Sequence, residues 1–433
     1  MVRTDDAYET RDERRNRHKA VGAAGIGWGL DGFTWTMYGF ALTVAMPVLG
    51  MSEGMSGWVT AISIVASAVG GVLFGYLADR FGRVRVLTWV ILGYSIFTAL
   101  TATSQNEAQF LIWRVLEGLT FGGEWAVGAA LVAEYAKPAK RGRALAFVQS
   151  CYAIGWALST VAYLVVFSLA APEVAWRYLF LIGVLPALFA FVIRRTTKDV
   201  ERVTEMQAAS SRPRIKELFA RGQAKRTIFA TTLGLGVQAI YYSVFIFLPT
   251  FLRDERGLSV VGTATYTWVA IVGSFLGYLA AGVFLDWIGR RPTFLIFFIG
   301  SAASVALFVL TPAAQPQLGV PIIFLLGLFA SGQAGGTGAY LSELFPTRIR
   351  ATGQAFSYNF GRGLAAFGPL TVGLAAASIG WGNSIMLIAC IGAAIGCFAL
   401  AMLPETKNTN ILDSKVIQNA VDSNQTYKTT MKD

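Results

Sequence analysis

The sequence is poor in the residues on which most catalytic and metal sites depend. Its 433 residues include one histidine, His18, and three cysteines, and only 14% of them are charged. Cys151, Cys390 and Cys397 all lie in apolar runs, so we expect no disulfide framework. The sequence contains no glycine-rich phosphate loop, metal-ligand cluster or nucleophile with its base. It therefore predicts a protein that is not an enzyme and needs no cofactor.

Apolar residues, by contrast, are abundant. They make up 55% of the chain, which is too high for a soluble protein of this length. Twelve runs reach the roughly 20 residues that cross a bilayer, and they lie near 21–47, 57–78, 86–104, 108–134, 144–169, 176–193, 227–252, 262–284, 293–311, 319–344, 351–379 and 383–403. The first run is too long for a signal-peptide core, so we interpret it as a retained helix. The sequence predicts an all-α membrane protein with twelve transmembrane helices.

Basic residues gather in the loops on one side of these spans. The opposite loops hold only Arg177, Arg253 and Arg256. This asymmetry places both termini in the cytoplasm, and it explains the net charge of +11 without nucleic-acid binding. The predicted organisation is a cytoplasmic N-terminal tail (1–20), a six-helix bundle (21–193), a basic cytoplasmic connector (194–226), a second six-helix bundle (227–403) and a cytoplasmic tail (404–433).

An internal repeat relates the two halves. The loop sequence GYLADRFGRVR at 75–85 reappears as GVFLDWIGRR at 282–291, and a Glu seven residues before an Arg occurs in both halves. Such a repeat is typical of transporters whose halves rock about a central site. We interpret the repeated charges as conformational latches at cytoplasmic helix ends, which pair between neighbouring spans and balance the inward-open and outward-open states. They are Asp79, Arg83, Asp286, Arg290, Glu134, Arg141, Glu343 and Arg350.

These loops, together with the closing Pro-Glu-Thr-Lys at 404–407, resemble the major facilitator superfamily. Leu-Asp-Gly-Phe at 30–33 and Arg114-x3-Gly-x4-Gly-Glu124 are similar to its proton-coupled organic-acid symporters, the sialate, aromatic-acid and monocarboxylate branches. Aromatic-acid carriers typically continue Asp-Gly-Phe with a second Asp, where this chain has Thr34. The paired Gln and Gly-Ile-Asn of sugar porters are absent from the seventh span. The resemblance implies two pseudo-symmetric six-helix bundles of the major facilitator fold.

Charged residues inside the spans indicate the working site, because such residues normally face a cavity or a partner. We assign proton coupling to Asp31, Glu124, Arg114 and Glu117. At about 1.5 Å per residue, Asp31 and Glu124 fall at the same depth, where each carboxyl raises the other's proton affinity. Two structural alternatives stay open. Arg114 and Glu117 stand three apart and can neutralise each other, and Glu124 follows two glycines and can cap a close helix contact.

Arg362 is the only basic residue deep inside the C-terminal half. Its planar guanidinium matches a carboxylate with two parallel hydrogen bonds, so we assign it to substrate binding. The alternative is that it pairs with a backbone carbonyl or a helix end. Mid-span aromatic and amide residues complete the predicted pocket, although such stripes also serve helix packing. They are Trp35, Tyr38, Gln149, Tyr152, Gln238, Tyr241 and Asn359.

The sequence therefore predicts a secondary active transporter of the bacterial inner membrane. We expect alternating access to import a small organic anion with protons, driven by the proton gradient. The expected partners are the anion, protons and membrane lipids, and a monomer is expected to suffice. A sugar or polyol symporter, a drug or metabolite exporter and a transporter-like receptor are the alternatives.

Overall fold

A computed structural model describes residues 11–135, 141–188, 215–220, 223–312, 316–346 and 349–407, which form helices and no strand. The N-terminal half comprises α1 (Arg11–Val48), α2 (Glu53–Phe81), α3 (Arg83–Thr101), α4 (Glu107–Tyr135), α5 (Arg141–Leu169) and α6 (Pro172–Ile182). A short helix, η2 (Ile215–Phe219), precedes the C-terminal half. That half comprises α9 (Ala224–Thr250), continued by η3 (Phe251–Glu255), then α10 (Val260–Trp287), α11 (Arg290–Leu310), α12 (Pro316–Leu344), α13 (Arg350–Ala365), α14 (Phe367–Ile379) and α15 (Trp381–Met402).

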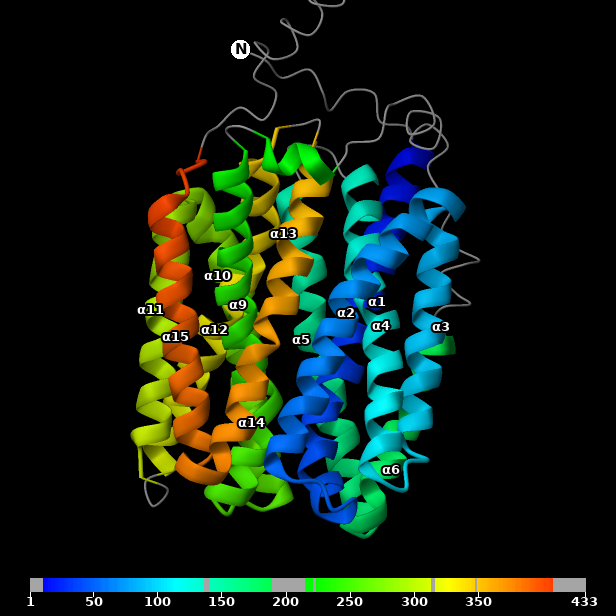
Figure 1. The fold of residues 1–433 in the computed structure, drawn as a ribbon, viewed down its shortest axis with the longest axis vertical. Coiled ribbons are helices and arrows are strands. Elements are labelled where there is room, and N and C mark those ends of the chain that lie inside the picture. The colour runs from blue at the N-terminus through cyan, green and yellow to red at the C-terminus, as the bar shows by residue number, and fades with distance from the viewer. Residues whose placement is uncertain are drawn as a thin grey trace, which may run out of the picture.

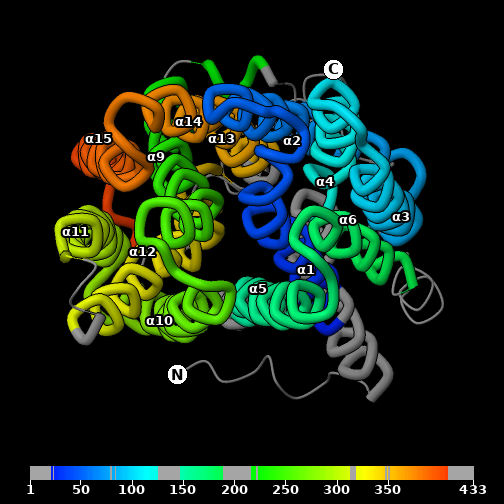
Figure 2. Tube along the Cα trace, turned by 90° about the horizontal axis from the view of Figure 1, so that it is seen from below, coloured from blue at the N-terminus to red at the C-terminus, as the bar shows by residue number. Residues whose placement is uncertain are grey.

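The helices run side by side in two groups. Figure 1 shows the N-terminal half beside the C-terminal half, with the start of α1 and the end of α15 at the same end of the bundle. Along the seam, α1 packs on α9, α2 on α13 and α14, and α5 on α10 (Figure 2). With α13 and α14 counted as one broken span, each half supplies six spans. The predicted fold of two six-helix bundles is confirmed.

The sequence repeat recurs in the local backbone. Gly82, between α2 and α3, has φ = 94°, and its counterpart Gly289, between α10 and α11, has φ = 105°. Only glycine adopts such angles without strain, which explains why both copies of the loop carry it. The helices before these loops also start alike. Ser52 and Ser259 cap α2 and α10, each side-chain oxygen accepting a backbone N–H at 3.1 Å.

The outer surface suits a lipid environment. In the described part of the chain, nine helices are long and apolar enough to cross a membrane by length and composition. Large apolar side chains face outward, including Val72 and Leu310, which are 61% and 70% exposed. In water, so much exposed apolar surface would drive aggregation.

Two of the three arginines at the end opposite the termini serve as helix caps. Arg256 donates hydrogen bonds to the carbonyls of Phe308, Val309 and Thr311 at the end of α11, at 2.5 to 3.0 Å. Arg177 donates to the Ala102 carbonyl after α3 at 2.6 Å. These basic residues satisfy carbonyls that the helix ends leave free. Because these two arginines cap helices, they are retained at this end although most basic residues lie in the loops at the opposite end.

The helix bounds differ from prediction in three places. α1 begins at Arg11, ten residues before the predicted span. The sixth span, predicted over 176–193, is observed as α6, which begins at Pro172 and ends at Ile182, before a turn at Gly183. The eleventh span, predicted as one run over 351–379, breaks at Ala366 into α13 and α14. Pro369 lacks the N–H that would bond to the Ala365 carbonyl, so the helical hydrogen bonding is interrupted there.

Backbone contacts close the seam at the end opposite the termini. A Cβ atom on Gly373 of α14 would lie 2.7 Å from the Cα of Gly57 on α2, and one on Gly39 of α1 would lie 2.8 Å from the Ile246 carbonyl of α9. Thr43 and Thr250 share a hydrogen bond of 3.2 Å across the same seam. The two halves therefore meet there at backbone distance.

Candidate functional site

Five charged side chains of the described residues lie buried close to where the two halves meet. Each is at most 1% exposed, and no other charged side chain in the described residues is among the buried ones. Three elements supply them. They are Asp31 on α1, Arg114, Glu117 and Glu124 on α4, and Arg362 on α13.

Arg114 and Glu117 form an ion pair on α4. The guanidinium Nη1 donates a hydrogen bond to the Glu117 carboxylate three residues later. The Arg114 guanidinium also lies 4.0 Å from the ring centre of Tyr38 and 5.7 Å from that of Trp35. Aromatic faces stabilise a buried cation. These contacts favour the structural alternative, in which the two charges neutralise each other.

Asp31 and Glu124 approach each other from α1 and α4, within electrostatic reach. The Glu124 carboxyl lies against α1 at Gly27, where a Cβ atom would come within 2.2 Å of its Oε1. Gly27 and Asp31 are four residues apart and share a helix face. Both Asp31 oxygens and Oε2 of Glu124 are buried without a hydrogen-bond partner. The Tyr94 hydroxyl of α3 lies close to Asp31.

Arg362 lies in the last turn of α13, just before the break at Ala366. Its Nη2 donates to the Tyr358 hydroxyl at 3.3 Å, whereas Nε and Nη1 have no partner. The guanidinium faces the ring of Tyr358 at 5.0 Å and, across the seam, that of Phe121 at 5.7 Å. Asp31 lies within its electrostatic reach. Two unpartnered donors on a buried cation are free to receive an anion.

Aromatic rings from both halves surround the cluster. Trp35 of α1 stacks on Phe121 of α4 with ring centres 4.7 Å apart, and its ring lies 5.6 Å from that of Tyr242 on α9. Tyr152 of α5 meets Tyr241 of α9 edge-on at 5.9 Å. Such walls offer flat apolar faces, and the phenol groups add polar points that orient a ligand.

The predicted amides occupy different surroundings. Nε2 of Gln238 on α9 is buried without a partner. Asn359 donates to the Ala355 carbonyl of its own helix at 3.0 Å, and its Oδ1 lies against Gly71 of α2. Gln149 is half-buried on α5. Gln238 is therefore available to a ligand, whereas Asn359 is engaged in packing between the halves.

Sequence reasoning missed several residues near the cluster, and one buried amide elsewhere in the C-terminal half. Tyr358, near the cluster, stands four residues before Arg362, and Gln333 on α12 is a mid-span amide whose Oε1 is buried without a partner. The spacing and polarity that selected other residues could have found these two. Tyr94, Phe121 and Tyr242 carry no such signal, because they lie in apolar runs and reach the cluster only through helix packing.

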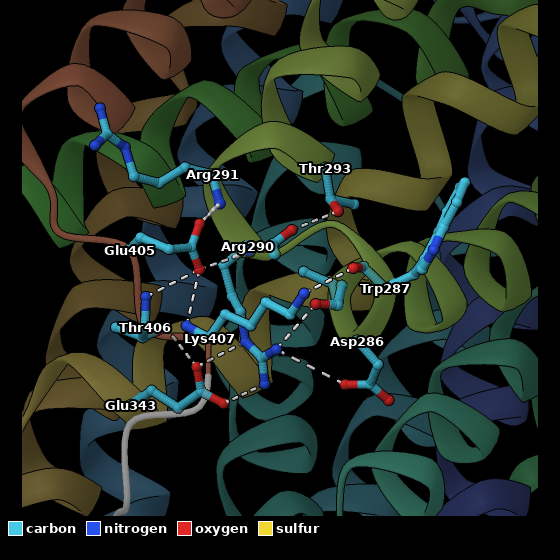
Figure 3. A network of polar contacts seen from close by, with 11 residues as sticks. Asp286, Trp287, Arg290, Arg291, Thr293, Glu343, Glu405, Thr406 and Lys407 are labelled. Carbon is cyan, nitrogen blue, oxygen red and sulfur yellow. Dashed lines mark hydrogen bonds and ion pairs between the residues drawn. The ribbon is translucent and has the colours of Figure 1, made fainter.

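A second charge cluster lies at the ends of α10, α11 and α12 nearest the termini (Figure 3). Arg290 donates to both Glu343 carboxylate oxygens at 2.8 and 2.9 Å, and its Nη1 lies 3.7 Å from Asp286. These predicted latch residues thus pair between neighbouring spans of a single half. The side chains of the other predicted latches lie outside the described residues; they are Asp79, Arg83, Glu134, Arg141 and Arg350.

The segment after α15 fastens onto this cluster (Figure 3). The Glu405 carboxylate accepts the backbone N–H groups of Arg290, Arg291, Thr406 and Lys407 at 2.8 to 3.0 Å. Partial burial raises the pKa of Glu405, but these four donors outweigh it and hold the pKa below its usual value. The segment therefore connects α15 to the start of α11 within the C-terminal half.

Two repeated six-helix halves with charges buried between them define a membrane transporter rather than an enzyme. The chain belongs to the Major Facilitator Superfamily, which matches residues 24–320 and 263–423.

The chain matches curated transporters over most of its own length and of theirs. The chain is 34% identical to a probable 4-methylmuconolactone transporter of Cupriavidus pinatubonensis, covering 91% of this chain and 92% of the relative. It is 31% identical to a putative niacin/nicotinamide transporter of Bacillus subtilis (92% and 98%) and 30% identical to a cis,cis-muconate transport protein of Acinetobacter baylyi (82% and 87%). The chain is thus a secondary transporter.

Solved structures agree with the fold. The xylose transporter from E. coli, in a partially occluded inward-open conformation, has a TM-score of 0.72 at 19% identity, covering 91% of this chain and 99% of that one. A bacterial homologue of the human lysosomal transporter Spinster has a TM-score of 0.69 at 17% identity (91% and 98%). At this identity the likeness concerns the fold alone.

Proposed function

We propose that this transporter imports a small, planar organic anion together with a proton by alternating access. One observation carries the proposal. Arg362 is buried with two unpartnered nitrogens, among aromatic rings and within reach of Asp31. A guanidinium pairs with a carboxylate through parallel, charge-assisted hydrogen bonds. The relatives named for muconolactone, niacin and muconate support a small organic acid as substrate.

The surrounding rings favour a planar molecule. Trp35, Phe121 and Tyr242 approach one another at ring-centre distances of 4.7 and 5.6 Å near Arg362. An aromatic or conjugated acid has two flat apolar faces that such rings cover. Its carboxylate can pair with the Arg362 guanidinium.

Proton coupling follows from the position of Asp31. An ionised Asp31 stabilises Arg362 electrostatically and repels an incoming carboxylate. Protonation of Asp31 removes that repulsion and leaves Arg362 to the substrate. The anion in turn favours the protonated carboxyl, because coupling between two binding sites is reciprocal.

The membrane placement belongs to the same proposal. In the sequence, basic residues gather in the loops predicted on the same side of the spans as both termini, which supports a cytoplasmic location for the termini in the inner membrane of a bacterium. One chain supplies both halves of the site, so a monomer suffices.

Uptake into proteoliposomes tests the function. Purified protein is given a pH gradient, alkaline inside, and labelled nicotinate, 4-hydroxybenzoate, cis,cis-muconate or xylose. We expect gradient-driven accumulation of a carboxylate and its loss in Arg362→Ala. Accumulation of xylose by both proteins would instead establish the sugar-carrier alternative.

A further inference from the structure

The charges of the buried site do not sum to zero. Its described residues include three carboxyls and two guanidiniums, which give a net charge of −1 when all are ionised. A net charge enclosed in a membrane protein is costly, because neither water nor a partner stabilises it. In this structure all five groups are buried together. They therefore need one bound proton to be neutral as a set.

Glu124 is the buried carboxyl that has no cation beside it among the described residues. Glu117 is paired with Arg114, and Asp31 lies within reach of Arg362. Glu124 forms no ion pair with any described residue, and no donor reaches its Oε2. Among the described residues, the titratable groups within its electrostatic reach are an acid, Asp31 on α1, and a phenol, Tyr94 on α3.

We propose that Glu124 stays protonated throughout the transport cycle and that Asp31 alone carries the transported proton. This inference rests on the proposed function and assigns different roles to two carboxyls that the sequence treats alike. Glu124 then acts as a neutral group that fills the space beside Gly27. Asp31, with both oxygens unpartnered, exchanges its proton as the anion binds and leaves.

The charge balance then determines the charge of the transported anion and the number of protons that move with it. The empty site is neutral with its resident proton on Glu124. A singly charged anion and one proton on Asp31 keep it neutral when loaded, so each cycle moves one proton with one anion and no net charge. A dianion leaves one uncompensated charge. We therefore expect it to be taken up about 70-fold less well, which corresponds to about 2.5 kcal/mol.

Infrared spectroscopy tests the resident proton without substrate. The carbonyl stretch of a protonated carboxyl is recorded at neutral pH for wild type, Glu124→Gln and Asp31→Asn, each a neutral substitution close in shape to the protonated acid. We expect the band in wild type, its loss in Glu124→Gln and its persistence in Asp31→Asn. A band that Glu124→Gln leaves unchanged, or that Asp31→Asn removes, overturns the assignment.

Transport separates this inference from the proposed function. The probe is whichever of nicotinate and 4-hydroxybenzoate wild type accumulates in proteoliposomes. We expect Glu124→Gln to keep accumulation driven by the pH gradient, Asp31→Asn to lose it, and an imposed potassium diffusion potential to leave the wild-type rate unchanged. Severalfold acceleration by the potential, or loss of coupling in Glu124→Gln, overturns the inference while the proposed function stands. If neither acid is transported, the proposed function fails, and the infrared result still decides the resident proton.

Discussion

Replacing Arg362 by lysine separates the charge of this residue from its shape. Lysine keeps the positive charge within reach of Asp31 but presents a single ammonium in place of the planar guanidinium. In the structure, one nitrogen of Arg362 bonds to Tyr358 and two are unpartnered. A carboxylate that uses both unpartnered donors in wild type would keep only one hydrogen bond to lysine.

The loss can be given a magnitude. A hydrogen bond to a charged group contributes about 1.5–3 kcal/mol, so Arg362→Lys should weaken carboxylate binding about 10- to 150-fold. Arg362→Ala removes both bonds and the cation, and we expect binding to fall below detection. Neutral nicotinamide, which lacks the carboxylate, should bind wild type and Arg362→Lys with similar affinity.

Calorimetric titration of purified protein with nicotinate and 4-hydroxybenzoate measures these affinities. Arg256→Lys is the matched control, because Arg256 caps α11 at the closed end and should change thermal stability but leave the Kd unchanged. Equal carboxylate affinities for wild type and Arg362→Ala would refute the assignment of Arg362 as the anion site.

Three further predictions concern coupling and stability. Asp31→Asn should abolish accumulation driven by a pH gradient but preserve substrate counterflow, and full accumulation by this variant would exclude Asp31 as the coupling residue. Gly289→Ala forces a positive φ on alanine and should destabilise the protein by about 1–3 kcal/mol in detergent melts; Gly282→Ala, with nothing within 4 Å of its new Cβ, is the control and should be neutral. Glu405→Gln should lower the melting temperature at neutral pH. Because the folded-state pKa of Glu405 is depressed, its contribution is fully present above the unfolded pKa of about 4.3, shrinks as the pH falls below that value and is lost below the folded-state pKa. A difference in melting temperature that does not shrink as the pH falls below about 4.3 would contradict the network.

Much of the fold could be predicted because the membrane limits the choices. A span must be apolar and helical, so length and hydropathy reveal it. The repeated loop also marks the duplication, since Gly82 and Gly289 are required by the same backbone angle. The break at Ala366 escaped prediction because the apolar run continues through it.

Some residues of the site could likewise be predicted from the sequence, and others could not. Asp31, Glu124 and Arg362 stand out because a charged residue inside a span normally faces a cavity or a partner. The surrounding aromatic residues could not be predicted, because the sequence does not distinguish Phe121 or Tyr242 from an aromatic residue that only packs against another helix. Their role depends on how α4 and α9 are placed across the seam, and that placement is set by packing.

The contact of Gly57 with Gly373 sets how closely α2 and α14 approach at the end opposite the termini. No side chain stands between α2 and α14 at this point, and any larger residue on α14 would meet the Gly57 backbone at 2.7 Å. At this contact, closure depends on the fit of the two backbones. A single added methyl group at either position would therefore prevent this end from closing fully, while the side chains of the binding site stay unchanged.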